Sequence, residues 1–244
     1  HCSENKIRLE SKNFTIRYHS NIPRQIGLGG SSAIITATMR ALMQFFQVEI
    51  PLEILPNVVL ASETQELRIN AGLQDRVIQA YEGCVYMNFD KALMERDGHG
   101  QYERLDPKLL PPLYIAYRTA LGKVSSGEVF NDLRSRFNQG EKQAVEGLKR
   151  IADLAEQGKQ AILSRNLEKL NKLIKQNYIE RKNIITLSPA NIQLVETAQN
   201  CGAPATFTGS GGAIIGTYAD NDMLTRLIVE FRKIKARVIR PYIV

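Results

Sequence analysis

Hydrophobic and polar positions follow two different rhythms along the first hundred residues. Strict alternation at 14–18 is typical of a half-buried strand. Apolar residues spaced by three or four positions predict helices over 33–47 and 58–67. A third, short helix is expected from Gly72, and the run 85–89 predicts a strand. The apolar face expected for the first helix carries Ile34, Thr38, Leu42 and Phe45.

The second half of the chain mixes strands and helices without regular alternation, which predicts an α+β fold. The polar stretch 95–107 ends at an Asp-Pro pair, so we expect one domain over 1–106 and another over 107–244. Ser188 and Pro189 have the residue types of a helix cap and first turn. We expect strands at 113–117, 213–218 and 237–242, and helices at 140–158, 161–184, 189–201 and 221–234.

Composition narrows the class of protein. Hydrophobic residues make up 43% and charged residues 23%, which is ordinary for a globular chain. The formal net charge of +7 suits an anionic ligand. The basic residues are spread out, with no aromatic-flanked tract, so we expect no nucleic-acid partner; binding with a steep salt dependence would contradict this. The apolar runs are shorter than the ~20 residues of a membrane span, so we expect no membrane association.

The three cysteines, Cys2, Cys84 and Cys201, are far apart, which excludes a disulfide framework and a Cys-x-x-Cys zinc site. This usage predicts a reducing, cytoplasmic setting. The histidines are equally scattered, so most histidine-based metal sites are excluded as well. The sequence gives no indication of an oligomeric state.

A glycine-serine loop at 27–32 is the strongest local signal for chemistry. Its glycines let the backbone approach a ligand closely, and the N-terminus of the following helix favours an anion. The hydroxyls of Ser31 and Ser32 can bind a phosphate oxygen or Mg²⁺. The loop is not a Walker motif, because no Gly-Lys-Ser/Thr follows, and Ser32 stands where a dinucleotide motif has its third glycine. The alternative is a glycine turn with a serine cap.

Two further segments carry polar or glycine-rich patterns. Asp75 lies near the start of the short helix at Gly72, twelve residues after Glu63, and could accept a proton or hold a metal. The alternative is a surface aspartate paired with Arg76, with Glu63 a solvated helix residue. Residues 208–213 are mostly small and allow close approach to a phosphate, although glycine-rich hairpin turns are common.

A serine hydrolase is a weaker alternative. Residues 29–33 nearly match the nucleophile elbow, and Ser31, Asp75 and His99 occur in the hydrolase order. However, His99 lies in a Gly-His-Gly segment, and its surroundings lack the alternation of strand and helix that this fold requires.

Together, the three segments resemble the motifs of the GHMP small-molecule kinases: galactokinase, homoserine kinase, mevalonate kinase and phosphomevalonate kinase. Within this superfamily the sequence is most similar to the sugar 1-kinases, above all the glucuronokinases, at 21–25, 71–76, 109–113 and 207–213. The resemblance extends over essentially the whole chain. It implies a two-domain fold, with a ribosomal protein S5 domain 2-like first domain and a ferredoxin-like second domain.

The resemblance also implies an activity, the ATP-dependent phosphorylation of D-glucuronate to glucuronate 1-phosphate. Asp75 then acts on the sugar hydroxyl, Ser31 and Glu63 hold Mg²⁺, and Gln74 and Arg181 contact the sugar or sugar acid. The alternative for Arg181 is a solvated residue at a helix end. The residues implied to bind ATP are Pro23, Gly27, Leu28, Gly29, Gly30, Ser31, Ser32, Ala33, Gly209, Ser210, Gly211 and Gly212.

The sequence departs from the family pattern in two places. Where the third motif often has a lysine, this chain has Ala205-Thr206. The first motif is absent, so we expect the first domain to be incomplete at its start and activity to depend on that segment. Two alternatives remain: a related heptose- or fucose-type sugar kinase, and a nucleotide-binding fragment without catalytic activity.

Overall fold

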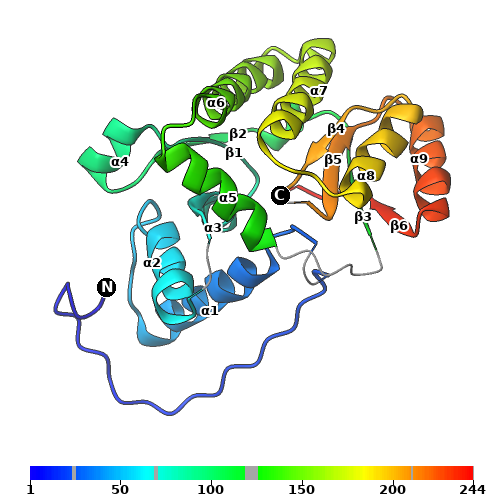
Figure 1. The fold of residues 1–244 in the computed structure, drawn as a ribbon. Helices are drawn as coiled ribbons and strands as arrows, with labels where there is room; N and C mark the ends of the chain where they lie inside the picture. The colour runs from blue at the N-terminus through cyan, green and yellow to red at the C-terminus, as the bar shows by residue number, and fades with distance from the viewer. Residues whose placement is uncertain (24–25, 69–70, 119–125, 210, 244) are drawn as a thin grey trace. The chain divides into compact units, whose positions relative to one another are not determined.

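The computed structural model describes residues 1–23, 26–68, 71–118, 126–209 and 211–243 (Figure 1). Internal contacts divide the chain into two compact units. The first unit consists of His1–Ile22 and Gly29–Arg104, and the second of Pro23–Leu28 and Leu105–Val244. The assignment of domains at residue 106 stays a prediction. Of the helices within the described ranges, none is long and apolar enough to cross a membrane.

The first unit is built from short helices and a two-stranded sheet. Its elements are α1 (Gly30–Phe46), α2 (Leu55–Ala61), a π-helical turn (Ser62–Glu66), α3 (Leu73–Tyr81), α4 (Lys91–Asp97), β1 (Cys84–Asn88) and β2 (Gln101–Leu105). The helices α1, α2 and α3 contact one another around a small apolar core. That core is formed by Ile50, Leu55, Val59 and Ala80, with Ile35, Met39 and Met43 of α1 packed against it.

The predicted apolar face of α1 is wrong by one position. The residues that pack against α2 and α3 are Ile35, Met39 and Met43, not the set that begins at Ile34. Apolar residues cover more than one side of this helix, so periodicity alone does not identify the side that its neighbours cover.

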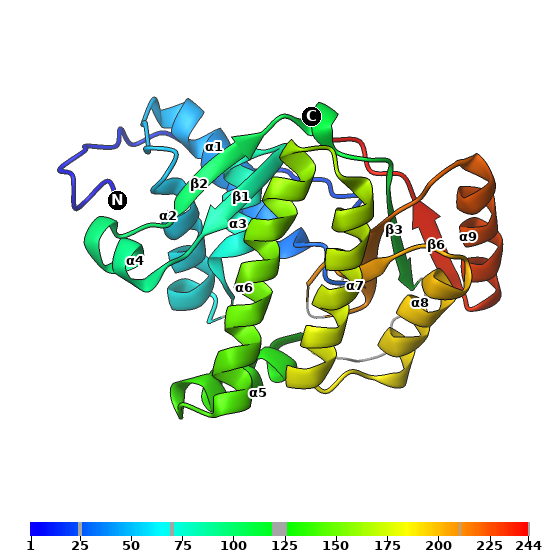
Figure 2. The ribbon, with the colours of Figure 1, turned by 90° about the horizontal axis from the view of Figure 1, so that it is seen from above.

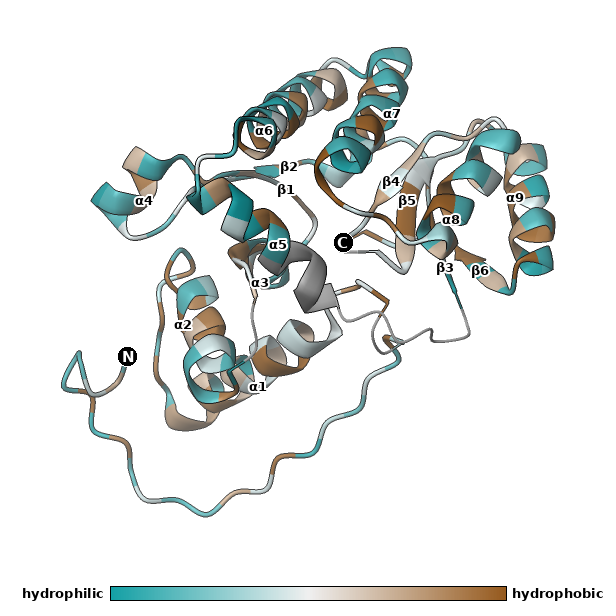
Figure 3. Cartoon of the chain, in the orientation of Figure 1, coloured by the Kyte–Doolittle hydropathy of each residue, from teal (hydrophilic) through white to brown (hydrophobic). Residues whose placement is uncertain are grey.

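The strand predicted at 14–18 is also wrong. Residues 7–20 belong to no helix or strand (Figures 1 and 3). The side chains of Phe14, Ile16 and Tyr18 are exposed. An alternating sequence defines two faces, but a strand forms only when its backbone finds a pairing partner. Phe14 instead lies 5.4 Å from the ring of Phe45, measured between centroids.

The second unit contains a four-stranded antiparallel sheet in the order β4-β5-β3-β6. The first and third strands along the chain lie in the middle, and the second and fourth lie at the edges, which is the predicted ferredoxin-like arrangement. The strands are β3 (Leu113–Arg118), β4 (Ala205–Phe207), β5 (Ala213–Thr217) and β6 (Ala236–Ile239). The helices are α5 (Ser126–Asn138), α6 (Lys142–Leu163), α7 (Leu167–Ile184), α8 (Pro189–Asn200) and α9 (Asn221–Lys233).

Helices α8 and α9 cover one face of this sheet, and α6 and α7 run side by side as a hairpin (Figure 2). The core between α8, α9 and the sheet includes the fully buried residues Tyr114, Leu194, Ile214, Leu227 and Phe231. Figure 3 shows hydrophobic positions along β5 and mostly hydrophilic ones on the outer side of α9. Ser188 caps α8 as predicted, because its hydroxyl accepts from the N–H of Asn191 at 3.3 Å.

Candidate functional site

The N-terminus of α1 is shaped by Gly29, which precedes the helix in the left-handed conformation at φ 62°. Its carbonyl accepts hydrogen bonds from the N–H of Ala33 at 3.0 Å, from Ser32 Oγ at 2.9 Å and from Gln79 Nε2 at 2.9 Å. A glycine has no side chain to cap the first N–H groups of the helix, so these can bind an anion.

The two serines of the loop have different surroundings. Ser32 is buried and also accepts from Gln79 Nε2 at 2.9 Å, so its hydroxyl helps to fix the loop. Ser31 is exposed and donates to Oε1 of Glu63 at 3.0 Å. Of the two hydroxyls, that of Ser31 is therefore the one accessible to a ligand.

Glu63 lies in the π-helical turn, and its side chain is 0% exposed. Arg76, on α3, donates through Nε to Glu63 Oε2 at 2.5 Å and contacts the same oxygen through Nη2. Nη1 of Arg76 donates to the carbonyl of Gly72 at 2.9 Å. Single-turn π insertions within helices are frequent at functional sites, and this one places a carboxylate beside Ser31.

Asp75 is close to the glycine-serine loop. A Cβ added at Gly29 would lie 3.3 Å from Asp75 Cγ, so the carboxyl group is directly beside the start of α1. Its Oδ2 is 3.6 Å from Arg76 Nη1, and half of its side chain is exposed. Partial burial raises the pKa of Asp75, Arg76 lowers it, and the charge of Glu63 raises it. The net effect is a raised pKa for Asp75, and half of its side chain can be reached from solvent.

The first unit thus brings Gly29, Ser31, Glu63 and Asp75 together, while Gln74 lies exposed on α3. Within the described part of the chain, no group of three or more His, Cys, Asp or Glu side chains could hold a metal by itself. A metal at Ser31 and Glu63 would need ligands from a bound molecule.

In the second unit, residues 26–28 pack against the third glycine-rich segment. Thr208 Oγ1 donates to the carbonyl of Gly27 at 2.9 Å. A Cβ added at Gly27 would lie 2.5 Å from the carbonyl oxygen of Gly211, and one at Gly212 would lie 3.1 Å from Ile26 Cα. Glycine is needed here because two stretches of backbone touch.

Other predicted ATP-binding residues surround this contact. Leu28 packs against the cluster of Ile26, Tyr117 and Ala213, and Pro23 is exposed. Gly209 lies against Gly27, and a Cβ added at Gly209 would be 3.2 Å from the Gly27 oxygen. Ser210 lies outside the described residues, as do Arg24 and Gln25.

Arg181 lies at the end of α7 and is largely buried, unlike the solvated arginine of the alternative interpretation. Its Nη1 donates to the carbonyl of Phe207 at 2.9 Å, its Nη2 donates to the carbonyl of Gly209, and it lies 5.8 Å from the centre of the Phe207 ring. Burial lowers the pKa of Arg181 to about 10. The guanidinium group therefore anchors the third glycine-rich segment through the carbonyls of Phe207 and Gly209.

Sequence reasoning missed three residues that support these loops, namely Gln79, Thr36 and Asn191. Gln79 lies one helical turn after Asp75 and binds Gly29, and Thr36 donates to Gln79 at 3.3 Å. In the second unit, Asn191 accepts from the N–H of Gly212 at 2.9 Å, within the predicted segment whose Thr208 binds Gly27. Only the position of Gln79, on the same face of a helix as Asp75, gave a signal in the sequence.

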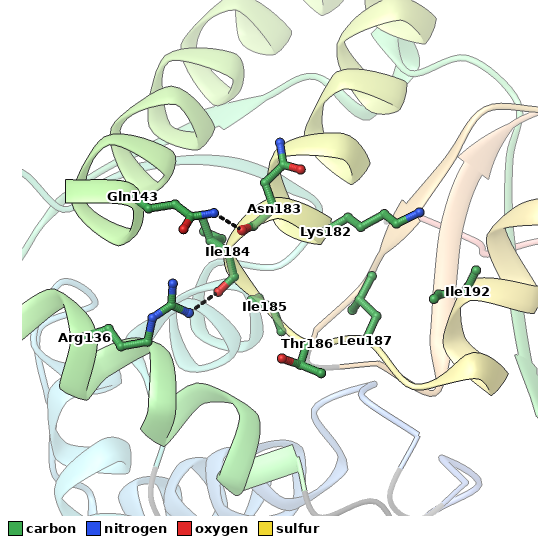
Figure 4. A pocket seen from close by; sticks show the side chains of 9 residues that line it. All are labelled: Arg136, Gln143, Lys182, Asn183, Ile184, Ile185, Thr186, Leu187 and Ile192. Atoms are coloured by element: carbon green, nitrogen blue, oxygen red, sulfur yellow. Dashed lines mark hydrogen bonds between the residues drawn. The ribbon is translucent and has the colours of Figure 1, made fainter. Parts of the chain in front are cut away.

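A pocket of about 410 Å³ lies elsewhere in the second unit, where α7 leads into α8 (Figure 4). Arg136 and Gln143 close one side by donating to the carbonyls of Ile184 and Asn183 at 2.8 and 2.7 Å. None of the site residues predicted from the sequence lines it. Its lining consists of Arg136, Gln143, Lys182, Asn183, Ile184, Ile185, Thr186, Leu187 and Ile192.

Comparisons with known proteins show the family to which the chain belongs. Residues 2–83 match the family model for the N-terminal domain of GHMP kinases. Glucuronokinase 1 of Arabidopsis thaliana is 40% identical over 235 residues, which cover 94% of this chain and 64% of that protein. Probable glucuronokinase 2 of the same plant is 40% identical over 247 residues, which cover 99% of this chain and 67% of that protein. The chain thus spans about two thirds of the length of these curated relatives.

Solved structures share the fold at low sequence identity. Galactokinase from Lactococcus lactis, complexed with galactose, superimposes with a TM-score of 0.71 at 18% identity. The superposition covers 91% of this chain and 67% of the galactokinase chain. Phosphomevalonate kinase from Streptococcus pneumoniae, in complex with phosphomevalonate and AMPPNP, has a TM-score of 0.70 at 17% identity, with 88% and 69% covered.

Proposed function

Because the chain belongs to the GHMP kinase family, we propose that it transfers the γ-phosphoryl group of ATP to the anomeric hydroxyl of D-glucuronate. The products are ADP and glucuronate 1-phosphate. Two relatives that are 40% identical over nearly the whole chain are named as glucuronokinases, which supports this choice of sugar. The observation that carries the proposal is the convergence of Gly29, Ser31, Glu63 and Asp75 at the start of α1.

Phosphoryl transfer depends mainly on positioning and charge neutralisation. The N–H groups at the start of α1 bind phosphate oxygens, because the helix dipole favours negative charge there. Gly29, Gly30 and Ala33 provide backbone at this point, and Ser31 adds an accessible hydroxyl. In the second unit, Gly209, Gly211 and Gly212 lie against the backbone of Ile26 and Gly27.

The donor set at Ser31 and Glu63 fits Mg²⁺. The ion prefers hard oxygen ligands and usually keeps few from the protein, with the rest supplied by phosphates and water. The Ser31 hydroxyl and Glu63 Oε1 are 3.0 Å apart, and both can serve as ligands. When bound, Mg²⁺ neutralises charge on the transferred phosphoryl group.

Asp75 acts as the base. As the anomeric oxygen attacks the γ-phosphorus, its proton passes to the Asp75 carboxylate, the new O–P bond forms and the bond to ADP breaks. Asp75 is suited to this step because its side chain is half exposed beside the start of α1. Gln74, exposed on the preceding position of α3, contacts the sugar, and Arg181 supplies the cation for its carboxylate.

The test is a kinase assay of the full-length protein with Mg-ATP and four sugars: glucuronate, glucose, galactose and fucose. We expect kcat/KM to be highest for glucuronate, with the product identified by phosphorus NMR as an anomeric phosphate. Preference for a neutral sugar would instead assign the protein to the related heptose- or fucose-type kinases. ATP binding without turnover on any sugar would contradict catalysis altogether.

A further inference from the structure

Arg76 is the only described cation that contacts both carboxylates of the proposed site, those of Glu63 and Asp75. Its side chain is 7% exposed and Glu63 is 0% exposed, whereas Asp75 is 51% exposed. One edge of the guanidinium group, Nε and Nη2, lies on Glu63 Oε2. Nη1 binds the Gly72 carbonyl at 2.9 Å and faces Asp75 Oδ2 at 3.6 Å.

In the protein without ligands, both carboxylate oxygens of Glu63 already accept hydrogen bonds from other side chains. Oε2 accepts from Arg76, and Oε1 accepts from the Ser31 hydroxyl at 3.0 Å. A buried carboxylate without a partner is strongly unfavourable, so a countercharge beside Glu63 is required whether or not a metal is present. Arg76 supplies that countercharge from within the chain.

We propose that Arg76 is an internal counter-cation that keeps Ser31, Glu63 and Asp75 from binding a free divalent ion, so that Mg²⁺ enters only together with ATP. The inference rests on the proposed function, because it concerns the metal of that same site. Two carboxylates and one guanidinium leave a formal charge of −1, which is too little to hold a dehydrated divalent ion with so few protein ligands. The triphosphate brings the missing oxygens and the missing negative charge.

The fork of the guanidinium group also makes Arg76 a positioning residue. It binds Glu63, the start of α3 and Asp75 at the same time, which a lysine ammonium cannot do with its single point of charge. Arg76→Lys therefore separates the two roles of the residue. The charge remains and free metal stays excluded, while kcat falls because Glu63 and Asp75 lose their fixed spacing.

The experiment measures binding of Mn²⁺, used as the probe for Mg²⁺, by electron paramagnetic resonance in the absence of nucleotide. Four proteins are compared with the parent chain: Arg76→Gln, Arg76→Met, Arg76→Lys and the double variant Arg76→Met with Glu63→Gln. We expect Arg76→Gln and Arg76→Met to bind Mn²⁺ at least about tenfold more tightly than the parent, since a positive charge next to the site is removed. The lysine and double variants should not gain this affinity.

Folding is monitored in the same samples by thermal unfolding with and without Mg²⁺. The glutamine amide in Arg76→Gln can still donate a hydrogen bond to Glu63, so we expect this variant to stay folded. Mg²⁺ should raise the Tm of Arg76→Gln and Arg76→Met but not that of the parent, because only these variants bind the free ion. A variant that folds only when Mg²⁺ is added supports the proposal equally. Loss of folding that Mg²⁺ does not restore overturns it.

The outcomes also separate this inference from the proposed function. Equal Mn²⁺ affinity in the parent and in both neutral variants overturns the role of Arg76 and leaves the kinase proposal untouched. When ATP is added, the parent should bind Mn²⁺; if it does not, the kinase proposal fails. A gain of free Mn²⁺ binding in Arg76→Gln that disappears in the double variant identifies Glu63 as the group that Arg76 neutralises.

Discussion

Glu63 and Asp75 contact the same arginine, yet their surroundings suit them to different tasks. Glu63 is fully buried, and both of its oxygens accept hydrogen bonds from the protein, so a substrate hydroxyl does not reach it in this arrangement. Asp75 is half exposed, and its contact with Arg76 is long, at 3.6 Å. A base has to reach the hydroxyl that it deprotonates, so Asp75 is the better candidate.

Replacing Asp75 with Asn keeps the size of the side chain and removes its ability to take a proton. We expect kcat to fall by about 10²–10⁴-fold, the usual contribution of a positioned base. The KM for ATP should remain close to that of the parent, as measured in steady-state assays of the full-length protein. Near-normal turnover would return Asp75 to the role of a surface residue at a helix start.

The pH dependence of the parent gives an independent check. Since burial raises the pKa of Asp75, the acid limb of the kcat/KM profile should lie above the ordinary aspartate value of 3.8. Activity is lost as the pH falls through that limb, because the carboxylate becomes protonated. Asp75→Asn should lack the limb.

Helix α3 is the element that organises the first unit. Asp75, Arg76 and Gln79 project from it toward the loop, the π-helical turn and Gly29. Helix α1 contributes its N-terminus. Gly29, which precedes it, is in the left-handed conformation, and its carbonyl accepts hydrogen bonds from Gln79 and Ser32. The proposed anion site is thus formed by residues of both α1 and α3.

Gly29→Val tests this helix end. A β-branched side chain is strained at φ 62°, and its Cβ would lie 3.0 Å from Gln79 Nε2. We expect Mg-ATP binding, measured by calorimetry, to be lost while circular dichroism stays native. Gly98→Val is the matched control, because Gly98 has a similar φ of 73° but open space around an added Cβ. Undiminished ATP binding in Gly29→Val would make the loop merely structural.

The elements differ in how well the sequence predicts them. Helices α8 and α9 begin at side-chain caps, such as Ser188, and their bounds agree with the prediction within one residue. The break between α6 and α7 was predicted too early, because α6 ends at Leu163 rather than at 158 and α7 begins at Leu167 rather than at 161. The polar stretch 95–107 gave no such prediction, yet it contains the end of α4 and the whole of β2. A cap by Asp90, whose carboxylate accepts from the N–H of Ala92 at 2.9 Å, and pairing with β1 stabilise elements that hydrophobic spacing does not indicate.

For the chain as a whole, the long-range contacts were beyond sequence reasoning. Residues 23–28 belong to the second unit although they lie between two segments of the first in the sequence, because Thr208 and Gly212 contact backbone 181 or more residues earlier. Motifs identified the types of residue in the site, and they implied that Ser31 and Glu63 act together. The bond from Arg76 to Glu63 and the bond from Gln79 to Gly29 were not predicted, because they depend on how the helical segments pack against one another.

The net charge of the chain, +7, is appropriate for a protein whose proposed ligands, ATP and a uronate, are both anions. General attraction does not select one sugar over another, so recognition of a uronate requires a cation that contacts its carboxylate. Arg181 is the candidate, although two of its N–H groups already bind the carbonyls of Phe207 and Gly209. A guanidinium group has five N–H donors, and these two bonds use two of them.

Arg181→Gln distinguishes recognition of the sugar acid from support of the loop. If Arg181 binds the carboxylate, kcat/KM should fall by roughly 10- to 150-fold for glucuronate alone, the loss of about 1.5–3 kcal/mol for a charge-assisted contact. If it only holds Phe207 and Gly209, then glucuronate, glucose and fucose should suffer alike, and the KM for ATP should rise with them. Lys182→Gln is the matched control, because it removes the neighbouring positive charge from the same end of α7. A selective loss in the control as well would show that overall charge, rather than the Arg181 guanidinium, decides the preference for the acid.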